Sequence, residues 1–303
     1  MQHRKIMTVL IAILALACLI VGISLVILHH RNEELPAASV EHLLTVLEKE
    51  RIRVDPALIS TKRQTGRVYV CDSGDYNRTV AALLGGSEQK AAYVIPDGEI
   101  VLLKNGARID FSRDFSFHYY QNGAPLSADT FDLEKQSATV SEQKREEICD
   151  TVTRFLDRGS RSFADAEKMN LETAVDTIWE NDGIYYALCT RTIGGVGITD
   201  NTVLCVLRHG EVAEAYGTWS FLTSGETYSA QLADMVNILF NVKKQIAMQE
   251  HPDVTIESIE SCYSLYSYGE HEALCLIPCW LIRTDTMGEF VYHAIDGISY
   301  TKD

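Results

Sequence analysis

The sequence predicts an α+β fold: a single N-terminal transmembrane helix followed by two or three exterior modules, each a helix packed on an antiparallel sheet. Two observations favour this class. Three passages of the chain begin with a helical apolar period and continue with strand-like stretches. Tight-turn motifs join those strand-like stretches directly, whereas a doubly wound α/β fold would place a helix between successive strands.

The N-terminal segment predicts a membrane anchor. Residues 6–28 contain 23 residues without a charge, enough at about 1.5 Å per residue to cross a hydrocarbon core of about 30 Å. Ala15-Leu16-Ala17 resembles a signal-peptidase site, but the apolar run continues to Leu28, so we expect the helix to be retained. Arg4 and Lys5 precede it, and the positive-inside rule then predicts a cytoplasmic tail of residues 1–5 and an extracytoplasmic remainder, in a single-pass protein of the cell membrane.

The exterior part of the chain is strongly acidic. Residues 32–303 carry 24 lysines and arginines against 42 aspartates and glutamates, a net charge of −18. Such a surface repels phosphate backbones, so we expect no nucleic-acid partner. The apolar content of 46% is enough for a packed core.

The first expected module covers residues 32–135. Val40, Leu43, Leu44 and Leu47 recur at helical spacing, and Ser39 before them is expected to cap the helix. Strand-like sequences follow at 67–73 and 91–111. The latter is interrupted by Pro-Asp-Gly and Lys-Asn-Gly, which predict two tight turns of a meander.

The second expected module covers residues 136–227. Ile148, Val152, Phe155 and Leu156 form one apolar stripe, and Gly159 is expected to end that helix. Strand-like stretches follow, with the sequences GIYYALCTRTIGG, TVLCVLRHG and EVAEAYGTWSFL. Their alternation indicates antiparallel strands.

The third expected module covers residues 228–303. The sequence YSAQLADMVNILFNVKKQIAMQE predicts a helix, with Pro252 just beyond its end. Three strands are expected after it. The last two, LCLIPCWLIRTD and EFVYHAIDG, are predicted to form a hairpin around the turn at Asp285–Gly288.

Two motifs in the chain suggest chemistry but fit a structural role better. Gly194-Gly195-Val196-Gly197 is followed by a strand-like sequence, whereas a dinucleotide-binding loop would open a helix, so we interpret it as a hairpin turn. His271, Glu272, Cys275 and Cys279 resemble a metal site. On a strand, however, the two cysteines would lie about 13 Å apart, too far for one tetrahedral ion.

The other reactive residues suggest no site either. His293 has no serine, cysteine or second histidine at motif spacing, and Asn77-Arg78-Thr79 fits an N-glycosylation acceptor by pattern alone. No nucleophile elbow, C-x-x-C pair, phosphate-binding loop or H-E-x-x-H motif is present. We therefore expect no catalytic, cofactor-binding or metal-ligating residues.

Seven cysteines follow the predicted membrane helix, an odd number scattered over the chain. A disulfide scaffold would be denser and even in number, so we expect buried free thiols. They are Cys71, Cys149, Cys189, Cys205, Cys262, Cys275 and Cys279.

The closing hairpin carries a family resemblance. The sequence LCLIPCWLIRTDTMGEFVYHAIDG is similar to the closing strands of the YycH/YycI family and of related PepSY-like modules, in which a Pro-x-Trp strand precedes an aromatic-rich strand. The short basic tail, the membrane helix and residues 35–60 also resemble the start of that family. The likeness covers the anchor, residues 35–60 and residues 229–297.

This resemblance implies a non-enzymatic, membrane-anchored regulator of a cell-envelope sensor histidine kinase, acting through its transmembrane helix and exterior domains. It implies as partners the kinase and a sister regulator, with the lipid bilayer around residues 6–28. Two alternatives stay open: an exterior hydrolase of cell-wall polymer, and a PepSY-like inhibitor or chaperone of an exported enzyme. A hydrolase would need two carboxyl groups about 5–10 Å apart in a deep groove.

The predicted anchor itself carries a stripe of small residues. Thr8, Ala12, Ala15, Cys18 and Gly22 fall on one helical face. Small residues permit close backbone approach between membrane helices. We expect this face to contact a partner helix.

Overall fold

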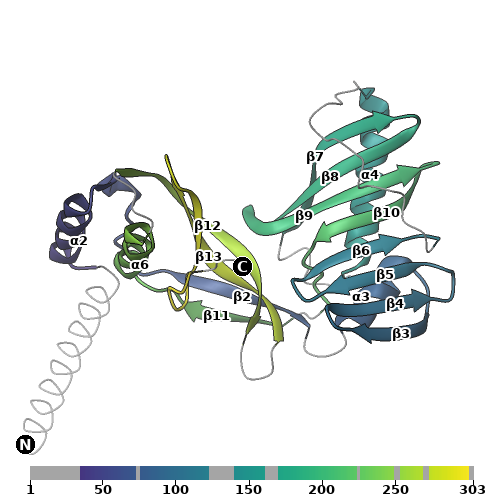
Figure 1. The fold of residues 1–303 in the computed structure, drawn as a ribbon, viewed down its shortest axis with the longest axis horizontal. Coiled ribbons are helices and arrows are strands. Elements are labelled where there is room, and N and C mark those ends of the chain that lie inside the picture. Colours follow the sequence, from purple (N-terminus) through teal and green to yellow (C-terminus); the bar gives the residue numbers. More distant parts are fainter. Residues whose placement is uncertain are drawn as a thin grey trace, which may run out of the picture. The chain divides into compact units, whose positions relative to one another are not determined.

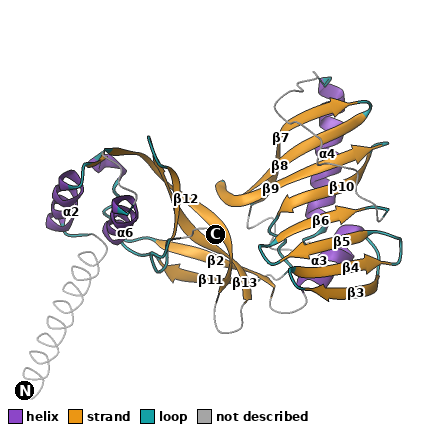
Figure 2. Cartoon of the chain, viewed as in Figure 1, coloured by secondary structure: helices purple, strands orange, loops and turns teal. Residues whose placement is uncertain are grey.

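The computed structural model describes residues 35–72, 76–122, 140–160, 170–223, 226–248, 253–268 and 273–299. Helices and mainly antiparallel strands pack together, which confirms the predicted α+β class (Figure 2). The described helices are α2 (Ala37–Lys49), α3 (Tyr76–Gly85), α4 (Glu142–Arg158) and α6 (Met235–Ala247), with a 3-10 turn, η1 (Pro56–Leu58). The described strands are β1 (Ile52–Val54), β2 (Thr65–Asp72), β3 (Gln89–Ile95), β4 (Gly98–Leu103), β5 (Arg108–Ser112), β6 (Ser116–Tyr120), β7 (Leu171–Asn181), β8 (Ile184–Ile193), β9 (Val196–Arg208), β10 (Glu211–Thr218), β11 (Thr227–Gln231), β12 (Val254–Tyr268), β13 (Ala273–Thr284) and β14 (Gly288–His293).

The chain divides into two compact units built from discontinuous segments. Unit 1 comprises the described parts of Met1–Gly66, Gln231–Glu260 and Trp280–Asp303, and unit 2 those of Arg67–Ala230 and Ser261–Cys279. Strands β12 and β13 contribute to both units.

Unit 2 contains a run of antiparallel strands in the order β7-β8-β9-β10-β6-β5-β4-β3. Helices α3 and α4 lie against one face of this sheet (Figure 1). The core between them includes Val80 and Leu84 of α3, Ile148, Val152 and Phe155 of α4, and Ile109, Tyr119, Val203 and Cys205 of the strands. Burying each large apolar side chain contributes about 1.5–3 kcal/mol, so this core stabilises the packing of α3 and α4 on the sheet.

Close packing of β9 and β10 in this sheet depends on a glycine. Gly217 of β10 has φ +139°, and a Cβ placed there would lie 2.1 Å from the carbonyl oxygen of Thr202 on β9. Any side chain would push the two strands apart, because backbone atoms cannot yield as a flexible side chain can.

Unit 1 is built around two helices, α2 and α6, that contact each other. Strand β1 pairs in parallel with the start of β12, and β14 pairs with β13. The core of unit 1 includes Leu43 and Leu47 of α2, Ile238, Leu239 and Val242 of α6, and Trp280, Ile282 and Tyr292 of the hairpin.

The predicted helices of the first and second modules are confirmed, as are their turns. Helix α4 ends at Gly159 as expected, and the Pro-Asp-Gly and Lys-Asn-Gly motifs connect β3 to β4 and β4 to β5. The cap assigned to Ser39 is wrong: Pro36 occupies the N-cap, and Ser39 lies in the first turn of α2, where its N–H bonds to the carbonyl of Pro36.

Two further predictions are corrected by the structure. The helix expected from Tyr228 begins only at Met235, because Thr227–Gln231 forms β11 and pairs with β2. Helix α3 was not predicted from the sequence. It is the next element after β2, which contains most of the strand-like sequence at 67–73.

None of the helices in the described part of the chain is both long and apolar enough to cross a membrane. Residues 6–28, where the sequence predicts the anchor, lie outside the described residues. The prediction therefore stays a prediction.

Candidate functional site

The closing stretch from Cys279 to Gly297 forms the predicted hairpin. Strand β13 runs into a turn and back along β14. His293, at the end of β14, is buried, with Nδ1 3.7 Å from Asp296 Oδ1. Burial lowers the pKa of His293, and the nearby carboxylate of Asp296 opposes this shift. His293 is therefore a neutral core residue at neutral pH.

The other sequence candidates are distributed as follows. Gly194 and Gly195, with φ +59° and +77°, form the tight turn between β8 and β9, as expected. Cys275 and Cys279 are buried on β13, whereas His271 and Glu272 lie outside the described residues. Within the described part of the chain, no three His, Cys, Asp or Glu side chains gather as metal ligands would.

The small-residue face expected on the anchor cannot be placed. Thr8, Ala12, Ala15, Cys18 and Gly22 all lie outside the described residues. Asn77, from the glycosylation-like motif, lies on α3, and its Nδ2 donates to Glu99 Oε2 at 3.3 Å.

The seven cysteines of the described chain are free thiols, and all but the half-buried Cys149 are buried, as predicted. Burial raises the pKa of the Cys205 thiol well above its usual value, with a further contribution from a hydrogen bond to Cys189. Burial likewise raises the pKa of Cys149 and of Cys275. A thiol that stays protonated is a poor nucleophile and a poor metal ligand, so these cysteines act as small apolar residues.

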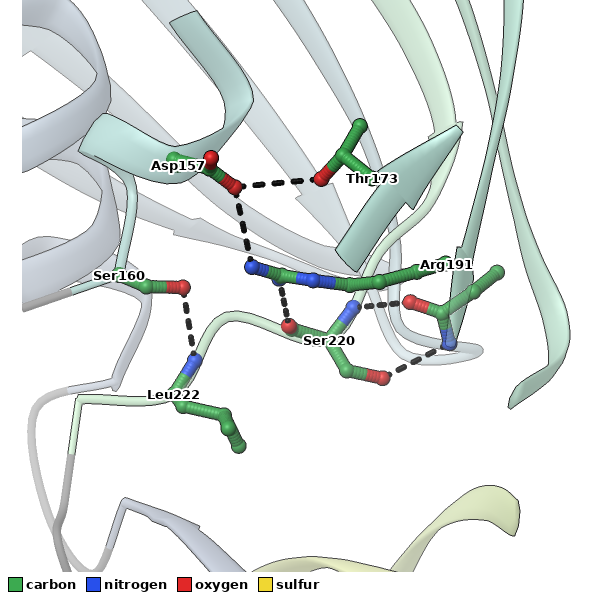
Figure 3. Close-up of polar contacts among 7 residues, drawn as sticks. Asp157, Ser160, Thr173, Arg191, Ser220 and Leu222 are labelled. Atoms are coloured by element: carbon green, nitrogen blue, oxygen red, sulfur yellow. Dashed lines mark hydrogen bonds and ion pairs between the residues drawn. The ribbon is translucent and has the colours of Figure 1, made fainter. Parts of the chain in front are cut away.

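The most elaborate polar network in the described chain surrounds Arg191 on β8 (Figure 3). Arg191 is 2% exposed; its Nη1 donates to the Ser220 carbonyl at 2.7 Å, and its Nη2 to Asp157 Oδ1 at 3.3 Å. The guanidinium carbon lies 5.1 Å from the centre of the Trp219 ring. Burial lowers the pKa of Arg191 to about 10, while Asp157 opposes that shift, so the side chain stays charged at neutral pH.

This network fixes the irregular segment that follows β10. Four successive backbone N–H groups each bond to a group from another part of unit 2. Their acceptors are Asn201 Oδ1 for Ser220, Tyr76 Oη for Phe221, Ser160 Oγ for Leu222 and the Cys71 carbonyl for Thr223. A buried segment without regular pairing must satisfy its N–H groups through such contacts.

The geometry around Arg191 is that of a structural clamp. Its cation is enclosed and already bound to a carboxylate and a carbonyl, and Thr173 Oγ1 donates to the same Asp157 oxygen at 3.2 Å (Figure 3). A guanidinium in this setting does not present its donors to a dissolved anion. Its chemical contribution is to hold Ser220 and the segment around it.

A second polar cluster lies on the sheet face opposite α4. Phe117 and Tyr119 of β6 point into the core, so His118 and Tyr120 point to the other face. There His118 Nε2 contacts the buried carboxylate of Glu214 on β10, and Tyr120 Oη lies 2.7 Å from His118 Nδ1. Because a carboxylate only accepts, we assign the proton to Nε2 and the Tyr120 hydroxyl as donor to Nδ1.

This cluster could pass a proton between a tyrosine and a glutamate, but its carboxylates are engaged. Asp110 on β5 accepts two bonds from Arg108, at 2.6 and 2.7 Å, and Glu214 accepts from His118. A glycosidase needs one carboxyl free to donate a proton and another free to attack or activate water. The cluster thus ties β5, β6 and β10 side chains together and does not meet that requirement.

Unit 1 carries a shallow groove of ≈ 500 Å³ beside α2 and β1. Its lining mixes apolar and charged side chains, including Leu44, Arg51, Arg53, Val54, Pro56 and Asp253. Arg53 and Asp253 form an exposed ion pair with a separation of 3.8 Å. Helix α2 begins nine residues after Leu28, a separation of at most about 32 Å for a fully extended chain.

Sequence reasoning missed the Arg191 and His118 clusters. Arg191 has the same strand parity as Ala187, Cys189 and Ile193, all of which are buried. A charge at an apolar position of an alternating strand was therefore a usable indication of a buried polar network. Glu214 on β10 gave no such indication in the sequence. The register shift between Val212 and Glu214 interrupts the alternation of buried and exposed side chains along that strand.

No protein-family model matches the chain, and no curated protein is detectably similar to it. Among solved structures, the chain is similar to an uncharacterized protein from Eubacterium rectale, with a TM-score of 0.39 and 13% identity, over 87% of this chain and 99% of that one. A likeness at this level supports no conclusion about function.

Proposed function

We propose that the chain is a non-enzymatic regulator, anchored in the cell membrane by residues 6–28, that controls a cell-envelope sensor histidine kinase. The exterior modules would contact the kinase close to the membrane, while the small-residue face of the anchor would contact one of its membrane helices. The proposal draws on the resemblance of residues 35–60 and 229–297 to YycH/YycI proteins.

The observation that carries the proposal is the groove beside α2. It is open, partly apolar and borders the helix that follows the predicted anchor, which suits docking of a neighbouring membrane protein. The engaged carboxylates of the His118 cluster make the alternative of a wall-polymer hydrolase less attractive.

Co-purification of the full-length chain from detergent-solubilised membranes tests this function. We expect mass spectrometry to identify a sensor histidine kinase in the eluate. Leu44→Glu places a charge in the groove and is expected to reduce kinase recovery about tenfold, equivalent to about 1.4 kcal/mol. Thr45→Glu, on the exposed side of the same helix, is the matched control and should retain the kinase.

Other results would overturn the proposal. An exported hydrolase or protease in the eluate, without a kinase, would indicate the inhibitor or chaperone alternative. Equal recovery of the kinase by Leu44→Glu and Thr45→Glu would exclude the groove as the contact.

A further inference from the structure

Strand β3 ends the run of strands in unit 2 and presents an apolar edge. Within the described chain it pairs only with β4. Its last three residues are unusually exposed for apolar side chains: Tyr93 at 55%, Val94 at 82% and Ile95 at 37%. An exposed apolar edge strand is a template for pairing with another strand.

The opposite end of the same run has a different character. Strand β7 pairs only with β8 among the described strands, and it carries Glu172, Asp176 and Glu180. A register shift between Val175 and Thr177 also interrupts its ladder. Charges and bulges are how proteins keep an edge from pairing. The apolar stretch of β3, Ala91–Ile95, carries no charge, and the register shift of β3 lies before it, between Gln89 and Ala91.

We propose that β3 pairs antiparallel with β3 of a second copy of this chain, on a two-fold axis at Tyr93. Full overlap of Ala91–Ile95 with its own copy requires Tyr93 to lie opposite Tyr93 of that copy. In this register Val94 faces Ala92, and Ile95 faces Ala91, so these two large side chains each meet a small one. Aromatic cross-strand pairs such as the central one stabilise antiparallel sheets.

Charge favours the same register. Lys90 falls opposite Pro96 of the second copy and beside its Asp97, so each end of the paired region joins a cation to an anion. Shifting the register by two residues in one direction brings Lys90 opposite Val94 and Gln89 opposite Ile95. Shifting it the other way brings Pro96 and Asp97 against the alanines. A closed two-fold pairing uses the same patch on both copies, as symmetric dimers do.

A contact of five residues per strand is small, so the dimer is expected to be weak and concentration-dependent. The proposal concerns unit 2 and does not depend on the groove of unit 1. Failure of either proposal leaves the other standing.

The first experiment is cross-linking of the full-length chain in detergent with a short bis-maleimide. Tyr93→Cys is expected to give a covalent dimer, because the two introduced thiols lie opposite each other at the axis. Thr177→Cys, an exposed position on β7, is the matched control, and the parent chain reports the background from Cys149. Equal cross-linking at positions 93 and 177 would overturn the proposal.

The second experiment is sedimentation analysis across a concentration series. Val94→Lys is expected to weaken dimerisation at least tenfold, because it adds a charge to the paired edge at a side chain that is 82% exposed and so not needed for folding. Met248→Lys, at another exposed apolar position, should dimerise like the parent. A parent that stays monomeric, or a Val94→Lys dimer as tight as the parent's, would overturn the proposal.

Discussion

Units 1 and 2 each place an arginine at the centre of a polar cluster, under opposite conditions. In unit 1, the side chain of Arg283 is 40% exposed and donates to Glu260 at 2.6 Å and to Glu289 at 2.7 Å. In unit 2, the side chain of Arg191 is 1% exposed and has a single, half-exposed carboxylate partner.

The comparison shows that proximity of opposite charges does not measure their structural importance. Water screens Arg283 and could replace either of its partners, so its ion pairs contribute little. Arg191 has lost its hydration, and Ser220, Asp157 and the Trp219 ring are the groups that the described chain places against its guanidinium. The cluster with the shorter ion pairs is therefore the less important one for folding.

Replacement of Arg191 by methionine should have the largest effect on stability. It leaves the buried Ser220 carbonyl without its donor, and we expect the free energy of unfolding of unit 2 to fall by about 2–3 kcal/mol. Hydrogen exchange of β8 and β10 amides in the full-length protein measures this change. If the β8 and β10 amides of Arg191→Met are protected from exchange as well as or better than in the parent, a buried apolar side chain stabilises unit 2 as well as Arg191 does.

Replacement of Asn201 by alanine tests the next contact of the same network. Asn201 accepts from the Ser220 N–H at 2.6 Å and donates to Ser220 Oγ at 2.8 Å, so its loss should cost about 1–2 kcal/mol in unit 2. Thr202→Ala, at the exposed neighbouring position, is the control and should change little. The same exchange experiment distinguishes the two variants.

Acid should weaken unit 1 through His293. Because burial lowers the pKa of His293 in the folded state, the unfolded chain, with a histidine pKa of 6.5, takes up a proton first. The stability associated with neutral His293 is fully present above pH 6.5 and is lost as the pH falls from there through the lower folded-state pKa. His293→Gln should remove this component from the pH dependence of exchange in β14. If hydrogen exchange in β14 depends on pH equally in His293→Gln and in the parent, then His293 does not titrate as its burial implies.

Replacement of Arg283 by methionine should have the smallest effect. With both partners exposed, we expect the free energy of unfolding of unit 1 to fall by less than unit 2 loses in Arg191→Met or Asn201→Ala, and by even less at high salt. Exchange in β13 and β14 at two salt concentrations checks this. A loss as large as that for Arg191→Met would abolish the contrast between the units.

Much of the local structure could be predicted because it depends on residue patterns within short stretches of the sequence. The apolar period of residues 148–156 gave α4, Gly194-Gly195 gave a turn, and alternating residues on both sides of Asp285–Gly288 gave the closing hairpin. Scattered cysteines indicated buried thiols, and six of the seven are buried. The helix and turn inferences need only neighbours within about ten residues, whereas the cysteine inference needs only the number and spacing of the cysteines.

Other features depended on partners far away in the sequence. Residues 227–231 form a strand and not the start of a helix because β2 offers an edge to pair with. The sequence analysis predicted three modules, each a continuous segment, at 32–135, 136–227 and 228–303. These boundaries stay a prediction. Unit 1 is assembled from segments far apart in the chain, because the apolar faces of α2 and α6 cover each other and the closing hairpin.

The class of the fold, most of its helices and turns, and the acidity of its surface follow from periodicity and composition, because these show which side of each element avoids water. The positions of the buried charges depend instead on how distant elements pack. Arg191 finds its carbonyl 29 residues away and its carboxylate 34 residues away, and Glu214 meets His118 from 96 residues away. A pattern along the chain indicates that a position is buried. Which groups compensate a charge at that position depends on the packing of elements that are distant in the sequence.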